Sequence, residues 1–306
     1  MINKEDAFFG YYPIRPNKVV AEGEAIEIYD LVGTDATLFH YSVNEGESSS
    51  GAQQVEQARM WFDSVWDTIG RDLGLMESDK LTTVIRESSG ILFDFDGPIC
   101  DVFAGLPAPG VAQDLTEVVA GHDVPLGGKA RGLEDPMEIL RLAVQGGEPV
   151  IRAVEEALTK AEVSAVKVAG PPIPGAVASL EAAHSSGRKT AVVSNNSAVC
   201  VRAFLKQHNL HHLVHEVIGR AAYRPDLMKP DPHSLLIAAE RLDVPPKRCT
   251  LIGDSVTDIE AARTAGAMSI GFANKPHKTL ALTEARADAV ITDMAEVAGA
   301  LASSPW

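Results

Sequence analysis

The chain has 306 residues, of which 45% are hydrophobic and 23% charged, an ordinary composition for a globular protein long enough for two domains. Its net charge of −15 argues against nucleic acid or an anionic membrane as a partner, and no apolar run approaches the roughly 18 residues that span a bilayer. Three scattered cysteines exclude a disulfide framework, and the first residues lack a secretory signal pattern, so we expect a cytoplasmic protein.

Residues 1–87 form a predicted N-terminal module that is acidic and rich in aromatic residues. Residues 1–90 hold 7 Lys and Arg against 16 Asp and Glu, so 7 − 16 = −9 of the net charge lies there. The stretches 24–31 and 36–43 are predicted strands joined by a turn, and apolar spacing predicts a helix over 55–69. Because a β-β-α unit this small buries little surface alone, we expect it to pack on the rest of the chain, or to mediate self-association or binding of a protein partner.

From residue 90 onward, short apolar strands alternate with helices. The predicted strands are GILFDFD, KTAVVSN, HEVIG, CTLIGD, MSIGFAN and AVIT. The predicted helices between them cover 176–186, 197–208, 232–242 and 256–265. This alternation is typical of a parallel sheet covered by helices on both faces. We therefore expect an α/β core domain formed by residues 88–103 and 172–306.

Residues 104–171 interrupt the alternation and contain no convincing strand. Within them, Asp135 is a predicted helix N-cap, Pro136 suits the first turn, and Gly146 ends the helix. A second helix is predicted over 148–163. An all-helical insertion directly after the first strand is expected to form a cap over the site that this strand presents.

Four aspartates are predicted to gather at one edge of the sheet, where ligands bind beyond the carboxyl ends of parallel strands. Asp94 and Asp96 end the first strand and, two residues apart, point to the same side. Asp254 ends a later strand, and Asp258 follows four residues on. Carboxylates this close repel one another unless they share a cation, and oxygen-rich sites suit Mg²⁺, which prefers a few carboxylates together with a substrate phosphate. The pattern therefore predicts a Mg²⁺ site.

Groups that bind anions are predicted at the same edge. Ser194 and Asn195 end the second strand just before a predicted helix, whose first backbone N–H groups are ready to bind an anion. Lys229 precedes a further helix and supplies a positive charge for a phosphate oxygen. Together with the aspartates, these residues predict a site for a phosphoryl group.

Four segments, FDFDG, VVSNN, LMKPDP and LIGDSVTDIEAARTAG, resemble in this order the motifs of the haloacid dehalogenase superfamily. The resemblance covers residues 90–302. It implies a Rossmann-like core, with residues 104–171 at the place of that family's helical cap. It also implies a Mg²⁺-dependent phosphatase of the phosphoglycolate-phosphatase-like branch that works through an aspartyl-phosphate.

The resemblance implies a role for each matching residue. Asp94 is the expected nucleophile, and Asp96 is the expected acid that protonates the leaving oxygen and then the base that activates water. Ser194, Asn195 and Lys229 are expected to hold the phosphoryl oxygens. The residues expected to bind Mg²⁺ or to order its surroundings are Asp94, Asp96 through its backbone carbonyl, Asp254 and, behind them, Asp258.

The expected substrate is a small phosphorylated metabolite, and Lys129 and Arg131 of the cap are candidates to contact a second anionic group on it. A phosphomutase or phosphotransferase of the same superfamily shares this apparatus, so it stays an alternative to the phosphatase. A regulatory or scaffold protein with a vestigial core is the other alternative. It is motivated by the N-terminal module, which the family pattern does not include.

Overall fold

The computed structural model describes residues 6–11, 14–21, 24–31, 37–42 and 80–304. The chain divides into two compact units, Met1–Leu75 and Met76–Trp306. In the part of the chain that is described, no helix combines the length and the apolar character needed to cross a membrane.

The described residues of the first unit form two small antiparallel sheets. The strands are β1 (Asp6–Tyr11), β2 (Ile14–Ala21), β3 (Glu24–Leu31) and β4 (Thr37–Ser42). β2 pairs with β3 and β1 with β4, so the strands predicted at 24–31 and 36–43 are present, but each pairs with a strand that was not predicted. Pro16 lies in β2 opposite Tyr29, which is possible because a two-stranded sheet has only edge strands, where proline is tolerated. The helix predicted over 55–69 lies outside the described residues.

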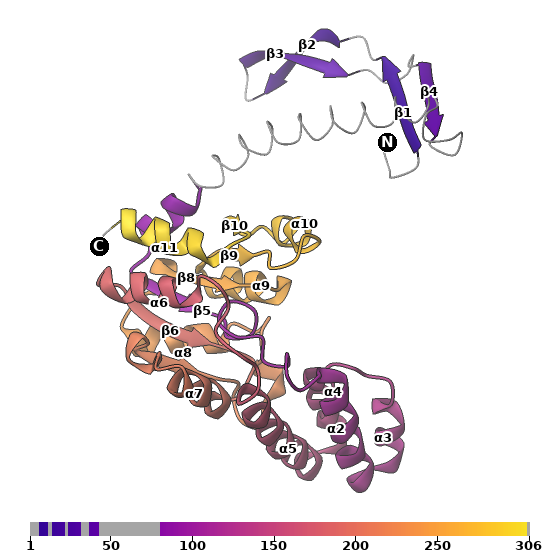
Figure 1. Cartoon of the computed structure of the whole chain (residues 1–306), viewed down its shortest axis with the longest axis vertical. Coiled ribbons are helices and arrows are strands. Elements are labelled where there is room, and N and C mark those ends of the chain that lie inside the picture. The colour runs from indigo at the N-terminus through magenta and orange to yellow at the C-terminus, as the bar shows by residue number, and fades with distance from the viewer. Residues whose placement is uncertain (1–5, 12–13, 22–23, 32–36, 43–79, 305–306) are drawn as a thin grey trace. The chain divides into compact units, whose positions relative to one another are not determined.

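The second unit is built on a six-stranded sheet with the order β10-β9-β8-β5-β6-β7 (Figure 1). The strands are β5 (Gly90–Phe93), β6 (Lys189–Val193), β7 (Glu216–Ile218), β8 (Cys249–Gly253), β9 (Met268–Phe272) and β10 (Ala289–Ile291). Every pairing is parallel, which confirms the predicted α/β fold. The carboxyl ends of all six strands therefore lie at one edge, with β5 between β6 and β8.

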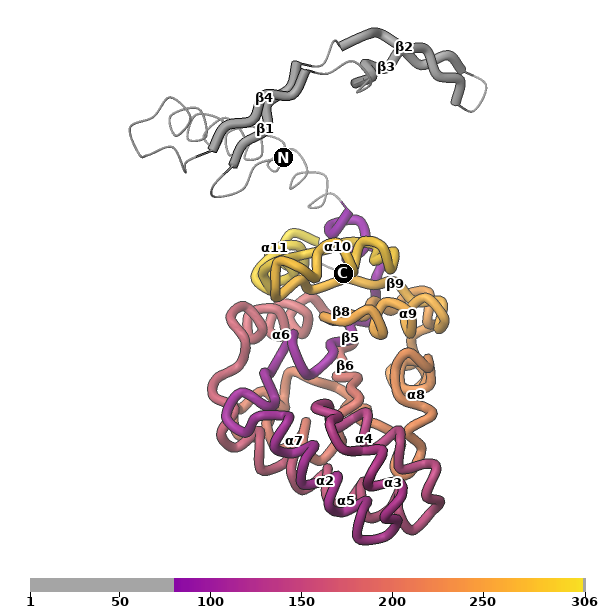
Figure 2. The backbone as a smooth tube through the Cα atoms, turned by 90° about the vertical axis from the view of Figure 1, so that its right-hand side faces the viewer, coloured from indigo at the N-terminus to yellow at the C-terminus, as the bar shows by residue number. Residues whose placement is uncertain are grey.

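Helices cover both faces of this sheet, and Figure 2 shows the strands between α6 and α7 on one side and α8 and α9 on the other. The helices of the core are α6 (Ala176–Ser185), α7 (Ala198–Gln207), α8 (His233–Leu242), α9 (Val256–Ala265), α10 (Lys278–Glu284) and α11 (Met294–Ser303). Ile91 and Phe93 of β5 pack in the apolar cluster of α6, α7 and α11, whereas Leu92 packs in that of α8 and α9. Because β5 is buried on both faces, its sequence is a continuous apolar run.

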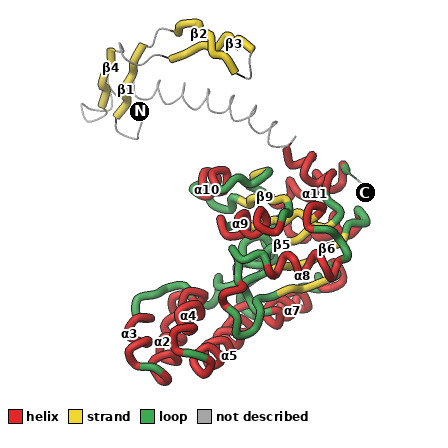
Figure 3. The backbone as a smooth tube through the Cα atoms, turned by 180° about the vertical axis from the view of Figure 1, so that it is seen from behind, coloured by secondary structure: helices red, strands yellow, loops and turns green. Residues whose placement is uncertain are grey.

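Four helices between β5 and α6 form the cap, which Figure 3 shows as helices joined by loops. They are α2 (Ala108–His122), α3 (Val124–Ala130), α4 (Pro136–Ala143) and α5 (Glu148–Val166). Asp135 caps α4, where its side chain accepts from the backbone N–H of Met137 at 2.8 Å. The sequence did not predict α2, because Pro109 and Gly110 are typical of loops. Proline is nevertheless tolerated in a first helical turn.

The cap and the core also contain four single 3₁₀ turns: Val144–Gly146, His211–Leu213, Pro225–Leu227 and Pro246–Arg248.

The boundary between the units falls after Leu75, earlier than the predicted end of the N-terminal module at residue 87. The described helical residues 80–87 belong to the second unit. Leu81 and Ile85 are buried in the same apolar cluster as β5, and the buried Arg188 donates to the carbonyl of Ile85 at 3.1 Å. This segment is therefore part of the core rather than of the module before it.

Candidate active site

Asp94 directly follows β5 and is buried at the carboxyl edge of the sheet. Its N–H donates to the carbonyl of Ile252 at 2.8 Å. Its Oδ1 accepts from the N–H of Phe95 at 2.7 Å and lies 2.8 Å from Lys229 Nζ. Burial and then the neighbouring Asp258 raise the pKa of Asp94 well above its ordinary value, while Lys229 acts to lower it. Ionised Asp94 therefore depends on positive charge close by.

Lys229 is the buried cation of this edge. Its Nζ lies 2.8 Å from Asp94 Oδ1 and 2.5 Å from Asp258 Oδ1, and it donates to the carbonyl of Val193 at 3.3 Å. Burial by itself would lower the pKa of Lys229, but Asp258 and Asp94 raise it above its ordinary value, so the ammonium stays charged. The other oxygen of Asp258 accepts from Ser255, from its N–H at 3.0 Å and its hydroxyl at 2.6 Å. This capping box of α9 turns Asp258 toward Lys229.

Asp96 lies two residues beyond Asp94, in the chain that leaves β5 for the cap. Its Oδ1 accepts from the N–H of Val102 at 3.0 Å. Burial raises the pKa of Asp96 to about 6, and the charge of Asp254 adds to this, although the bond from Val102 acts to lower it. A carboxyl group with a pKa this close to neutrality can both give up and accept a proton.

A pocket of about 260 Å³ lies beside Asp96, with Asp254, Lys275 and Lys278 also in its wall. Oδ2 of Asp254 accepts from Asn274 Nδ2 at 3.0 Å and lies 2.5 Å from Lys278 Nζ. The two lysines and Asn274 were not predicted as site residues. Asn274 and Lys275 closely follow β9, whose carboxyl end lies at the same edge, so the rule that located Asp254 also applies to them, whereas Lys278 lies further on, at the start of α10.

Gly97 makes the approach of Asp254 possible. Its φ is +104°, and a Cβ built on it would lie 2.3 Å from Asp254 Cγ. Only glycine adopts this backbone conformation freely. The chain that carries Asp96 therefore passes directly against the Asp254 carboxylate.

The acidic group could hold a hard cation. Within the described residues, one set of three possible ligands lies close together, the carboxylate oxygens of Asp94, Asp254 and Asp258, all within 4.8 Å of one another. Such an all-oxygen set fits Mg²⁺ or a similar ion. Both oxygens of Asp258 already have partners in Lys229 and Ser255. Asp94 and Asp254 are therefore the pair with the best access to a cation.

Ser194 and Asn195 lie in the loop after β6. The Ser194 hydroxyl donates to Asn196 Oδ1 at 3.1 Å. Asn195 brackets the backbone of Lys229, since its Oδ1 accepts from the Lys229 N–H at 2.8 Å and its Nδ2 donates to the Lys229 carbonyl at 3.3 Å. The helix predicted over 197–208 is α7, whose N-cap is Ser197. Ser194 lies three residues before that cap.

The cap residues predicted to contact substrate lie away from this pocket. Lys129 is exposed and donates to Gln145 Oε1 at 3.1 Å, and Arg131 is exposed at the end of α3. Neither lines the pocket beside Asp96. Instead, Arg141 of α4 reaches the core, where its Nη2 donates to the carbonyl of Lys229 at 3.3 Å. Which face of α4 meets the core depends on how the cap docks, which the helical pattern does not specify.

Comparisons with known proteins found matches in a family model, in related sequences and in solved structures. A family model described as haloacid dehalogenase-like hydrolase matches residues 89–266. The chain is 29% identical over 124 residues to a phosphoglycolate phosphatase of Pasteurella multocida, covering 40% of this chain and 54% of that relative, about half its length. It is 27% identical over 214 residues to a phosphoglycolate phosphatase of Salmonella typhi, covering 61% of this chain and 82% of the relative. The crystal structure of β-phosphoglucomutase from Clostridium difficile matches with a TM-score of 0.51 and 22% identity, covering 68% of this chain and 92% of that one. At this identity, the structural likeness shows a shared fold.

Proposed function

The chain belongs to the haloacid dehalogenase-like hydrolase family, and we propose that it is a Mg²⁺-dependent phosphatase that hydrolyses a small phosphomonoester through an aspartyl-phosphate. One observation carries the proposal. Two carboxyl groups follow strand β5. Asp94 contacts the buried Lys229, and Asp96, whose pKa is raised to about 6, lies beside a small pocket. The similarity to two phosphoglycolate phosphatases supports the same reaction class.

The proposed reaction uses the two aspartates in turn. Asp94 attacks phosphorus, so that a bond from its carboxylate oxygen to phosphorus forms while the bond to the leaving oxygen breaks. Asp96 gives its proton to that leaving oxygen. The resulting Asp96 carboxylate then takes a proton from the water that hydrolyses the aspartyl-phosphate. Because the pKa of Asp96 is about 6, both of its forms are accessible near neutral pH.

Positive charge lets an anionic nucleophile approach an anionic phosphate. The protein supplies part of this charge through Lys229, whose Nζ lies 2.8 Å from Asp94. The side chain of Asn195 holds the Lys229 backbone in place with two hydrogen bonds. Asp94, Asp254 and the carbonyl of Asp96 would hold Mg²⁺. When bound, the ion supplies further charge neutralisation for the phosphoryl oxygens.

The proposed substrate is a small phosphorylated metabolite. The pocket of about 260 Å³ is smaller than the usual ligand site of about 300–1,000 Å³, which favours a small substrate. The three cysteines are buried free thiols, which suits the reducing cytoplasm that we propose as its location. We also propose that the first unit mediates self-association or binds a protein partner.

The test of this function is release of inorganic phosphate from p-nitrophenyl phosphate and from a panel of phosphorylated metabolites. We expect turnover with Mg²⁺, none after treatment with a chelator, and recovery when Mg²⁺ is restored. Product analysis separates the mutase alternative, because a mutase transfers the phosphoryl group without releasing it. A folded, metal-replete protein that is inert across the panel would rule the proposal out.

Gly97→Ala is expected to lower turnover strongly. The new Cβ meets the carboxylate of Asp254, which must shift, and misplacing a reacting group by about 1 Å can cost about 10²-fold in rate. Alanine is also strained at the φ of +104° that position 97 requires, which costs about 1–3 kcal/mol of folding free energy. Steady-state kinetics and thermal unfolding of the variant measure the two effects.

Gly170→Ala is the matched control for backbone strain. Gly170 has φ +90°, yet a Cβ there would have no neighbour within 4 Å. We expect both variants to lose stability, but only Gly97→Ala to lose most of its activity and to need more Mg²⁺. Equal losses of activity in the two variants would mean that strain, rather than the position of Asp254, limits turnover.

A further inference from the structure

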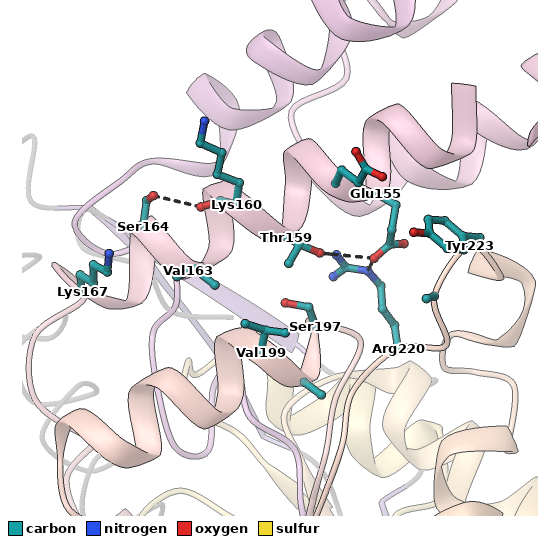
Figure 4. Close-up of a pocket in the computed structure, with 13 residues that line it drawn as sticks. Glu155, Thr159, Lys160, Val163, Ser164, Lys167, Ser197, Val199, Arg220 and Tyr223 are labelled. Atoms are coloured by element: carbon teal, nitrogen blue, oxygen red, sulfur yellow. Dashed lines mark hydrogen bonds and ion pairs between the residues drawn. The ribbon is translucent and has the colours of Figure 1, made fainter. Parts of the chain in front are cut away.

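Arg220, in the loop after β7, is a buried cation bound by helix α5 of the cap. Its side chain is 1% exposed. Its Nε lies 2.7 Å from Glu155 Oε1 and its Nη1 2.5 Å from Glu162 Oε1, while its Nη2 donates to Thr159 Oγ1 at 3.0 Å. Figure 4 shows the guanidinium extended toward Glu155 and Thr159. Spacings of four and three residues place all three acceptors on one face of α5.

The same group of residues holds the loop after β6. Nη1 of Arg220 donates to the carbonyl of Asn195 at 3.2 Å, and the N–H of Arg220 donates to the carbonyl of Asn196 at 3.0 Å. Glu162 accepts from Asn196 Nδ2 at 3.2 Å through Oε1, and from the N–H of Ser197 at 3.0 Å through Oε2. A carboxylate of the cap therefore bonds both to the buried cation and directly to this loop.

The contacts continue to the nucleophile. Asn195 brackets the backbone of Lys229 with two hydrogen bonds, and Lys229 Nζ lies 2.8 Å from Asp94. Glu162 is thus connected to Asp94 through polar groups that are largely buried.

Packing alone does not set the position of this loop. A pocket of about 680 Å³ opens beside the network, between α5 and the start of α7, with Val163 and Val199 in its wall (Figure 4). Val199 is 60% exposed, so the apolar contact there is incomplete. A buried arginine with two carboxylates is no more stabilising than well-packed apolar residues. What the polar network adds is a defined geometry.

We propose that Arg220 and Glu162 are positioning residues that fix the loop after β6 so that Ser194 and Asn195 can bind phosphoryl oxygens. Helix α5 thereby becomes a support of the phosphate site as well as a part of the cap. This role rests on the proposed phosphatase function, which assigns phosphate binding to the loop.

Glu162→Gln and Glu155→Gln are a matched pair that tests the proposal. Each neutralises a carboxylate bound to Arg220 without changing its size. At Glu162 both oxygens accept from donors, so a Gln NH₂ group must face a donor and displace the loop. Glu155 Oε2 has no hydrogen-bond partner within the described residues, so a Gln there keeps its oxygen on Arg220 and turns its NH₂ to the unpaired side.

The expected readout is binding of inorganic phosphate in the presence of Mg²⁺, measured by calorimetry. Glu162→Gln should weaken the affinity about tenfold, equivalent to about 1.4 kcal/mol, and raise KM more than it lowers kcat. Glu155→Gln should change the affinity by less than about twofold. Hydrogen exchange of the backbone amides at residues 194–197 should accelerate in Glu162→Gln but not in Glu155→Gln.

Arg220→Lys is a further test variant. It keeps the positive charge but loses the guanidinium group, whose several N–H donors join α5 to the carbonyl of Asn195. We expect it to weaken phosphate binding and to accelerate exchange as Glu162→Gln does, which also covers the case that one variant does not fold. Equal effects of the two Gln variants, or unchanged exchange in Glu162→Gln, would overturn the proposal. A wild-type protein without phosphatase activity would refute only the proposed function, since the exchange comparison does not depend on turnover.

Discussion

Asp94→Asn is expected to abolish phosphate release, with a loss on the order of 10⁴-fold or more, because the amide that replaces the carboxylate is not a nucleophile. The fold should persist. Asparagine is nearly the same size, and its Oδ1 can still accept from Phe95 and from Lys229. The variant also removes a buried carboxyl group whose pKa burial raises, so thermal stability should be equal to or above that of the wild type.

Asp226→Asn is the matched control for this change. Asp226 forms an exposed ion pair with Arg224, so the same substitution there should leave turnover unchanged. Phosphate release from p-nitrophenyl phosphate and mass spectrometry of the acid-quenched enzyme measure the two parts of the effect. If Asp94→Asn turns over within about tenfold of the wild type, or still accumulates a phosphorylated protein, Asp94 is not the nucleophile.

Site residues that follow strands were predictable from the sequence. Asp94 and Asp254 were placed together because parallel strands present their carboxyl ends at one edge of a sheet, wherever they lie in the chain, whereas Lys229 was placed there by the predicted helix that it precedes. Lys278 lies at the same edge but follows β9 at a distance, in a segment without any motif. Only the folded chain shows that its ammonium reaches Asp254.

The partners of buried charges were not predictable in the same way. Asp258 was expected to order the surroundings of a metal, and the sequence did not predict that its partners are Lys229 and Ser255. Arg220 has its carboxylate partners on α5, about sixty residues away in the sequence. Such pairs depend on how the cap docks on the core, and neither helical periodicity nor strand alternation encodes that docking.

Strand pairing in the first unit was also not predictable from the sequence. The strand 24–31 was predicted with its bounds, but its partner was not, because alternating apolar residues indicate a strand without specifying the strand beside it. β1 pairs with β4 across the β2–β3 hairpin. Pairing of this kind is settled by tertiary contacts.

Lys229→Met is expected to cost about 10²–10³-fold in kcat/KM, the usual effect of removing one group that stabilises developing charge. It should also destabilise the fold by about 3–5 kcal/mol, because Asp94 and Asp258 then face each other at a buried site without their cation. Lys229 acts to lower the pKa of Asp94, so its removal raises that pKa further. Since a carboxyl whose pKa is raised on folding binds its proton more tightly in the folded state, the stability of the variant should fall as pH rises from the unfolded-state pKa to the folded-state pKa.

The double variant Lys229→Met/Asp258→Asn separates stability from catalysis. It removes one of the two carboxylates that faced the lysine, so Asp94 no longer faces the charge of Asp258, and the unfolding temperature should return toward that of the wild type. Turnover should stay low, because no cation lies beside Asp94 to favour its ionised form or to offset the charge of the phosphate. Thermal unfolding across pH and steady-state kinetics measure the two responses. Recovery of both stability and activity in the double variant would show that Lys229 serves only to neutralise buried charge, whereas recovery of stability alone assigns it a direct part in the reaction.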